Sequence, residues 1–293
     1  MRAIESEGYD VVKTYGALNP ETFAAIVAQA RQDDVPVIGH MPNMRRSTPK
    51  EVLIPGFGLI AHAEEVAQAT RNGSDADIAR YVELARRNGT GLVSTIVLDS
   101  RIVDQTLDVN SLRQVPGFAY VHPYDLPSWF AFNRYGARNT PERVASLRAM
   151  VAFNARLVRA FHAAGLPVYP GTDSMISGMI AGFSLHDELE ALAEAGIPDE
   201  TLLLAATRGA SEWLRTSPER GTIEVGKRAE LLLLDADPVA SVANTRRIAD
   251  VFTGGRRLRR EDLDDMLASL ARRYAAMPPF QTQQPGASAP APH

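Results

Sequence analysis

Four side chains that can bind a metal ion or move a proton stand at the ends of strand-like apolar runs. YDVVK ends on Lys13, VPVIGH on His40, GLIAH on His62 and PVYPGTD on Asp173. Imidazole and carboxylate groups bind divalent ions, which activate water for attack on a carbonyl group. A lysine on such a strand also suits Schiff-base chemistry. The residue types therefore predict hydrolysis or carbonyl chemistry at one shared site.

These side chains meet only if the strands that carry them are parallel neighbours. Each apolar run has about five residues and leads into a helical stretch, a pattern typical of a parallel (β/α) barrel. In such barrels the chemistry collects at the C-terminal ends of the strands. Taken singly, a histidine or an aspartate at a strand end is more often structural. Four at successive strand ends favour a functional site.

The remaining sequence predicts five such strands, each separated from the next by a helix or a loop. Capping residues open the expected helices, as at Asn19 and Ser74. We expect helices over 21–34, 77–89, 141–164, 185–197 and 198–214, with the fourth strand at 91–98. Residues 99–139 are rich in aromatics and prolines and are predicted to be a long lid or substrate-facing insertion. Candidate substrate contacts are Tyr15, His122, Tyr124 and His186.

The pattern of predicted elements changes after the barrel-like part, from alternating strands and helices to short strands. We divide it into a barrel region over 1–220, strands of a small sheet over 221–260, a docking helix over 261–277 and a disordered tail over 278–293. In the second region we expect two short strands about a turn at Gly226 and a third strand after them.

Composition limits the classes of partner. The chain has 31 Lys and Arg against 35 Asp and Glu, so its formal charge of -4 disfavours nucleic acid and favours a small-molecule substrate. Without cysteine it cannot use disulfides or thiolate ligands. It has neither a signal peptide nor an apolar run long enough for a membrane span. We therefore expect a cytoplasmic protein with no membrane partner, and we leave its oligomeric state open, with a homo-oligomer among the options.

The motifs DVVKTYG, GHMPN, IAHAEE, VYPGTDS, LHDELEALAEAGI, LLAATRGA and GTIEVGKRAELLLLDADP occur in this order along the chain. Together they resemble the amidohydrolase superfamily, in particular its imidazolonepropionase-like and prolidase-type members. The resemblance implies an α/β fold, a TIM-type (β/α) barrel with a C-terminal β-sandwich portion. One small departure is Glu230, where the family usually has aspartate.

The resemblance also implies roles for the four strand-end residues. A carboxylated Lys13 would bridge two metal ions, His40 and His62 would bind the second ion, and Asp173 would bind the first ion and shuttle a proton. The implied cofactor is a divalent metal, as one or two ions, and zinc suits these ligands best. The implied reaction is hydrolysis of a C–N bond, in an amide, a cyclic amide or a dipeptide.

One element of the family pattern is absent. The family's His-x-His pair on the first barrel strand has no counterpart among the six histidines, and only about the last five βα units are represented. An N-terminally truncated protein, a one-metal variant and a remnant without catalysis are the three explanations, and truncation is our expectation. In that case an export signal could have been lost with the missing strands.

Two rival functions remain open on the sequence alone. One is a non-catalytic interaction protein built on a degenerate barrel. The other is a Schiff-base lyase that uses Lys13 as its nucleophile.

Overall fold

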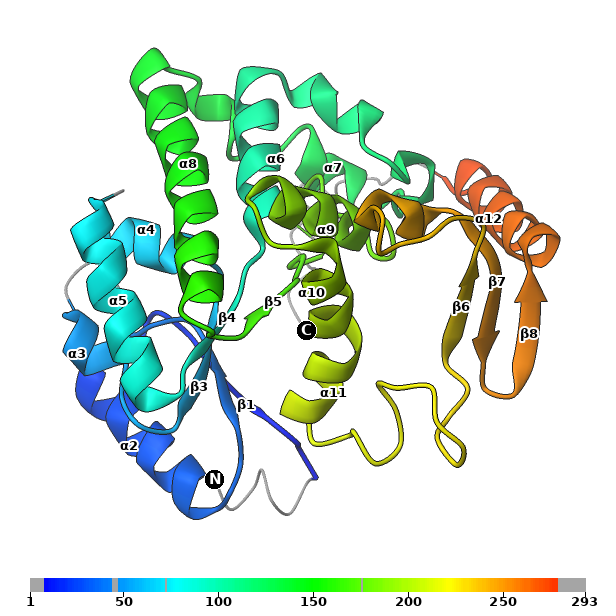
Figure 1. The fold of residues 1–293 in the computed structure, drawn as a ribbon. Helices are drawn as coiled ribbons and strands as arrows, with labels where there is room; N and C mark the ends of the chain where they lie inside the picture. The colour runs from blue at the N-terminus through cyan, green and yellow to red at the C-terminus, as the bar shows by residue number, and fades with distance from the viewer. Residues whose placement is uncertain (1–7, 44–46, 72, 175, 279–293) are drawn as a thin grey trace, which may run out of the picture.

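The computed structural model describes residues 8–43, 47–71, 73–174 and 176–278. Its first part is a parallel sheet of five strands that lie side by side in chain order (Figure 1). The strands are β1 (Val12–Thr14), β2 (Val37–Gly39), β3 (Phe57–Ala61), β4 (Gly91–Val93) and β5 (Val168–Tyr169). The α/β class is confirmed, and a parallel sheet with helices between successive strands is consistent with part of a barrel.

Helices cover one face of this sheet. They are α2 (Pro20–Gln32), α3 (Pro49–Val52), α4 (Glu64–Thr70), α5 (Asp75–Asn88) and α8 (Pro141–Ala163). Their apolar faces form the main core with the strands, around fully buried side chains such as Phe23, Phe57 and Phe161. The predicted caps are confirmed, since Asn19 accepts a hydrogen bond from the Thr22 N–H at 2.7 Å and Ser74 forms a capping box with Asp77.

The strand ends come together because the strands are parallel and nearly in register. Lys13 pairs with Ile38, and the His40 N–H donates to the Thr14 carbonyl at 3.0 Å. The close approach of β1 and β2 depends on Gly39, where a Cβ atom would lie 2.3 Å from the Thr14 carbonyl oxygen. His40 and His62 are the residues that directly follow β2 and β3. Tight strand pairing therefore delivers both imidazoles to one edge of the sheet.

The fourth strand is shorter than the predicted 91–98, because its second half belongs to a helix. Strand β4 ends at Val93, and α6 (Ile96–Leu107) follows it. The reversal occurs at Thr95, whose φ of 50° turns the chain out of the sheet. Short helical turns then fill the insertion: η1 (Val109–Gln114), η2 (Phe118–Tyr120), α7 (Leu126–Trp129) and η3 (Gly136–Arg138).

Beyond β5 the chain forms α9 (Ser184–Glu194) and a second, segmented helix. That helix consists of α10 (Asp199–Leu204), a π-helical turn η4 (Ala205–Gly209) and α11 (Ala210–Trp213). Figure 1 shows it standing beside β5. The two predicted helices are thus confirmed, with one interrupted by a wider turn.

The C-terminal region is a single antiparallel sheet of three strands, β6 (Leu231–Leu234), β7 (Ile248–Thr253) and β8 (Arg256–Arg259), with η5 (Val242–Arg246) before β7. The expected pair of strands about Gly226 was wrong, because only β6 forms there. The hairpin lies instead at Gly254 and Gly255, whose φ values of 56° and 72° suit a tight turn between twisted strands. One layer of a sandwich is present among the described residues.

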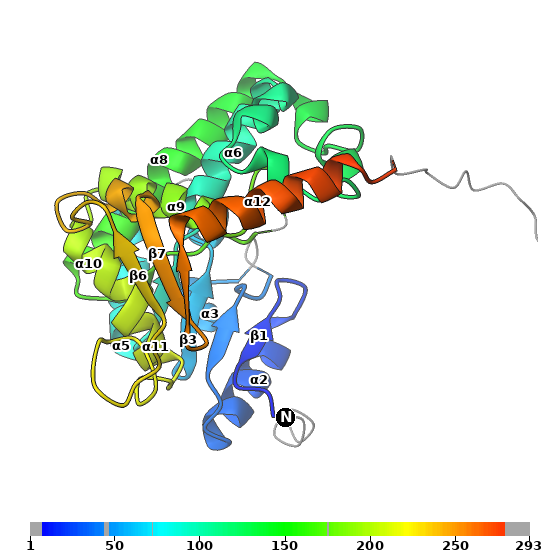
Figure 2. The ribbon, with the colours of Figure 1, turned by 90° about the vertical axis from the view of Figure 1, so that its right-hand side faces the viewer.

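A helix, α12 (Arg260–Ala275), is present where the docking helix is predicted; it extends away from the end of the three-stranded sheet (Figure 2) and contacts η2 in the insertion. Nearly all of the predicted tail, 279–293, falls outside the described residues. No helix within residues 8–43, 47–71, 73–174 and 176–278 is both long and apolar enough to cross a membrane.

Candidate metal centre and its cavity

A cavity of about 520 Å³ opens at the edge of the sheet where β1 to β3 end. All four strand-end candidates line it: Lys13, His40, His62 and Asp173. Its other walls come from α4, α6 and α8, from the insertion, and from the segment after β5. The structure thus brings together residues that are up to 160 positions apart in the sequence.

His40 is held by a buried carboxylate. The His40 ring donates from Nδ1 to Glu65 Oε1 at 2.7 Å, and the other oxygen of Glu65 accepts from the Met41 N–H at 2.9 Å. Glu65 has no exposed surface. Tyr15 stacks on the same imidazole with 4.9 Å between ring centroids. Because Nδ1 is engaged, Nε2 is the nitrogen of His40 that is left for a metal ion.

His62 shows the same arrangement more deeply buried. Its Nδ1 lies 3.0 Å from Thr95 Oγ1, while its buried Nε2 has no hydrogen-bond partner in the described part of the chain. Burial lowers the pKa of His62 to about 4, and the nearby charges of His40 and Lys13 act in the same direction against that of Asp173. The ring is therefore neutral near pH 7, which is the form that binds a metal.

Asp173 faces His62 across the cavity. Its Oδ2 lies 4.0 Å from His62 Nε2, and about a third of its side chain is exposed. Both residues have left-handed backbone conformations, with φ of 47° for Asp173 and 79° for His62. Such strain is uncommon outside glycine and concentrates at functional sites, where the surrounding structure holds it in place.

Lys13 is the most exposed of the four strand-end candidates. Its side chain is exposed, and Nζ lies 5.2 Å from the centroid of the Tyr15 ring. The reason is that β1 is an end strand of the sheet, and within the described residues it pairs with β2 alone and has no strand on its outer side.

The donors fit a divalent ion. No three His, Asp, Glu or Cys side chains among the described residues are placed to hold a metal. Two imidazoles are nevertheless present with 4.9 Å between their centroids, each with Nδ1 hydrogen-bonded. The orphaned Nε2 of His62 is a buried polar atom that an ion would satisfy. Further oxygen donors would come from Asp173 and, in carboxylated form, from Lys13.

The sequence analysis did not predict the two residues that hydrogen-bond to the histidines. Glu65 belongs to the motif IAHAEE and lies three positions after His62, yet its partner is His40, 25 positions away. Thr95 reaches His62 from 33 positions away. The adjacent acids in that motif were the available signal for Glu65, whereas Thr95 carried none.

A pair of acids forms the inner wall beside the histidines. Glu64 lines the cavity and shares a hydrogen bond with the buried Asp99, which also accepts from Asn154 Nδ2 at 2.6 Å. Burial raises the pKa of Glu64, and burial together with the charge of Glu64 raises the pKa of Asp99 well above its usual range. Both carboxyl groups therefore bind a proton more readily than an exposed acid does.

Glu188 anchors the start of α6 from α9. It accepts hydrogen bonds from the Ser94 hydroxyl and from the N–H groups of Ile96 (3.2 Å) and Val97 (2.8 Å). These contacts hold the turn that presents Thr95 to His62. Burial raises the pKa of Glu188 from 4.5 to about 7.

This pKa predicts a pH dependence of folding. Between pH 4.5 and about 7 the folded state holds more proton on Glu188 than the unfolded chain does, so rising pH lowers stability. The difference corresponds to about 3 kcal/mol. We expect Glu188→Gln to remove this loss. Urea unfolding across this pH range measures it, and equal slopes for both proteins would contradict it.

Three of the candidate substrate contacts lie elsewhere. The ring of His122 packs against Tyr124 and Tyr274 where α12 meets the insertion. His186 Nδ1 lies 2.7 Å from Thr245 Oγ1, which joins α9 to the C-terminal region. None of these is a lining residue of the cavity, whereas Tyr15 is.

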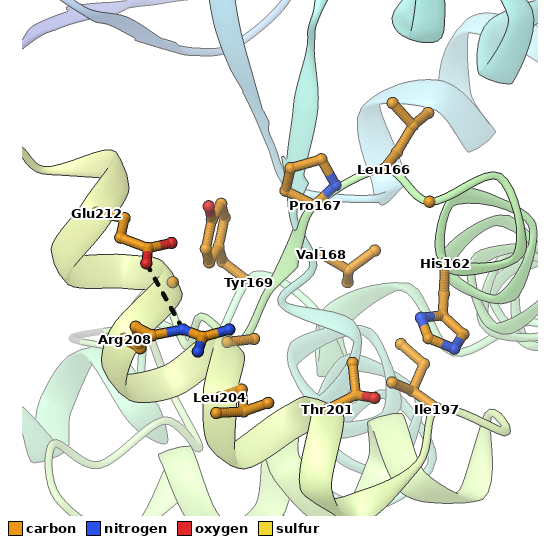
Figure 3. Close-up of a pocket in the computed structure, with 13 residues that line it drawn as sticks. His162, Leu166, Pro167, Val168, Tyr169, Ile197, Thr201, Leu204, Arg208 and Glu212 are labelled. Atoms are coloured by element: carbon orange, nitrogen blue, oxygen red, sulfur yellow. Dashed lines mark ion pairs between the residues drawn. The ribbon is translucent and has the colours of Figure 1, made fainter. Parts of the chain in front are cut away.

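A second cavity, of about 320 Å³, lies beside β5 (Figure 3). Its wall is largely apolar, and its charged pair, Arg208 and Glu212, is joined at 3.5 Å on one helical stretch. His162 is one of its lining residues, and none of the four strand-end candidates is. We assign this cavity no chemistry.

Comparison with known proteins agrees with the fold. The model of the amidohydrolase family matches residues 13–258, most of the chain, which therefore belongs to this family. No curated protein matches the chain.

Three solved structures share the fold. A bottromycin amidohydrolase is 24% identical with a TM-score of 0.69, and the match covers 94% of this chain and 61% of that one. An Xaa-Pro dipeptidase with bound methionine is 19% identical with a TM-score of 0.58, and the match covers 88% of this chain and 56% of that one. A putative prolidase from Bifidobacterium longum is 22% identical with a TM-score of 0.57, and the match covers 94% of this chain and 62% of that one. This chain thus spans about three fifths of the length of the proteins it matches.

Proposed function

We propose that this chain carries the metal-binding half of a hydrolase that cleaves the C–N bond of an amide in a small molecule. The observation that supports this most is the pair His40 and His62. Both rings line one cavity with Lys13 and Asp173, and both have Nδ1 engaged. His40 and His62 would hold a divalent ion, zinc being the best match, with Asp173 and a carboxylated Lys13 completing its ligands.

When bound, such an ion acidifies water and polarises a carbonyl group. The chain's own residues would do the rest. The oxygen of a water molecule bonds to the substrate carbonyl carbon, and Asp173 takes the proton that this water loses. It then delivers that proton to the nitrogen as the C–N bond breaks. Glu65 and Thr95 fix the orientation of the two imidazoles throughout.

The proposal is tested first by metal content. Protein purified without chelator is expected to hold about one or two equivalents of a transition metal by elemental mass spectrometry. His40→Ala and His62→Ala should each lower the bound metal at least about tenfold, since each removes a ligand. His162→Ala, which alters a histidine at the second cavity, is the matched control.

Hydrolysis is then assayed on a panel of dipeptides, N-acyl amino acids and cyclic amides. Metal content and hydrolysis that persist in both His40→Ala and His62→Ala would refute the proposal. So would a folded wild-type protein that binds none of the divalent ions offered to it.

A further inference from the structure

The wall of the cavity contributed by the insertion and the start of α8 is cationic. Arg134, Tyr135 and Arg143 line the cavity there. Arg134 is engaged, since its Nη2 donates to Tyr135 Oη at 2.7 Å and its guanidinium lies over the Tyr135 ring. Neither arginine forms an ion pair with a carboxylate in the described parts of the chain. Arg143 differs in that its Nε is buried without a hydrogen-bond partner.

An unpaired guanidinium in a cavity is an incomplete anion site. Arginine keeps its charge at all physiological pH values and binds a carboxylate through two parallel hydrogen bonds. Leaving buried donor atoms unsatisfied costs free energy, which an arriving anion would recover. The acids on the same cavity, Glu64 and Asp173, belong to the metal-centre end.

The direction of the helices places Arg143 far from the metal centre. Two hydrogen bonds show that α6 and α8 run antiparallel: Asn154 reaches Asp99 near the start of α6, and Asn139 reaches the Leu107 carbonyl at its end. The start of α6 is the end next to His62, through Thr95. Arg143, in the first turn of α8, therefore lies toward the opposite end of the cavity.

Apolar side chains separate the two ends. Leu147 and Met150 follow Arg143 at helical spacing on the same face of α8, and all three line the cavity. Leu98 and Ile102 line it from α6. Met150 lies seven positions after Arg143, which corresponds to a rise of about 10 Å along the helix axis. The cavity thus has a metal end, an apolar middle and a cationic far end.

We propose that Arg143 binds a carboxylate at the far end of the substrate, and that the substrates are amides of acids whose carboxylate is separated from the cleaved bond by an apolar chain. This inference rests on the proposed function, because it assumes that the cleaved bond lies at the metal end. A carboxylate attached next to the amide nitrogen would be too close to that end to reach Arg143.

The test is calorimetric binding to the full chain with three probes. N-acetyl-ε-aminocaproate has an acid separated from its amide by a methylene chain, its primary amide is the neutral counterpart, and N-acetylglycine has the acid beside the amide. We expect the caproate to bind about tenfold more tightly than its neutral counterpart and more tightly than N-acetylglycine.

Arg143→Met should abolish the preference for the acid while leaving affinity for the neutral amide unchanged, since it keeps an unbranched apolar side chain. Arg143→Lys should retain part of the preference, because charge remains and the two-pronged geometry is lost. Arg148→Met, on an exposed position of the same helix, is the matched control and should bind as the wild type does.

Wild-type protein that binds acid and amide equally, or that binds neither, overturns the inference. So does a preference that survives in Arg143→Met. The binding measurement does not depend on hydrolysis. A chain that holds no metal and hydrolyses nothing would refute the proposed function, but the binding constants would still decide the role of Arg143.

Discussion

Asp173→Asn is expected to lower the rate of hydrolysis about 10²–10⁴-fold, the usual contribution of a positioned proton-transfer group. Asparagine has nearly the same shape as aspartate but cannot take up a proton at neutral pH. It also tolerates the left-handed backbone at this position, where φ is 47°. The substitution therefore removes proton transfer and leaves the fold intact.

The measurement is the single-turnover rate on the best substrate of the panel, at matched metal content. Ser174→Ala, at the neighbouring residue, serves as the control, because its hydroxyl bonds to the Thr172 hydroxyl at 2.7 Å and lies outside the cavity lining. An Asp173→Asn protein that retains its metal and the full wild-type rate would rule out Asp173 as the proton carrier.

Glu65→Gln is expected to weaken metal binding roughly 10–100-fold, although Glu65 is not itself a proposed ligand. Both oxygens of this fully buried carboxylate are used, one by His40 and one by the Met41 N–H. Glutamine offers one acceptor oxygen and one amide NH₂ group, so one of these two donors loses its partner. The His40 ring would then be less firmly oriented and a weaker base toward the metal.

Competition with a chromophoric chelator measures this affinity, and urea unfolding checks that the variant is folded. Glu83→Gln is the control, because Glu83 is a partly exposed acid of α5 that forms ion pairs only with Arg86 and Arg87 among the described residues. Wild-type metal affinity in a folded Glu65→Gln protein would contradict the orienting role. A protein that fails to fold would be replaced by Glu65→Asp, which keeps the charge and shortens the reach.

Local patterns predicted the ends of β1, β2 and β3 and most helices well. The motifs around His40 and His62 combine an apolar run with a polar residue at its end, and this is enough to place both at one edge of a parallel sheet. Helix starts such as Asn19 were readable because a capping contact spans only three residues. The turn at Thr95 was not readable, since its stretch GLVSTIVL is apolar throughout and suits a strand or a helix alike.

The sequence by itself determined the family, the order of the strands and four residues that line one cavity, because these depend on local periodicity and side-chain chemistry. The tertiary structure decided which groups support them. Glu65, Thr95 and Glu188 act on partners 25, 33 and up to 94 positions away. It also decided that Lys13 is exposed on an end strand and that Arg143 faces the same cavity as His62. Burial and hydrogen-bond partners arise only when distant segments pack together, and no pattern within a short stretch of sequence specifies them.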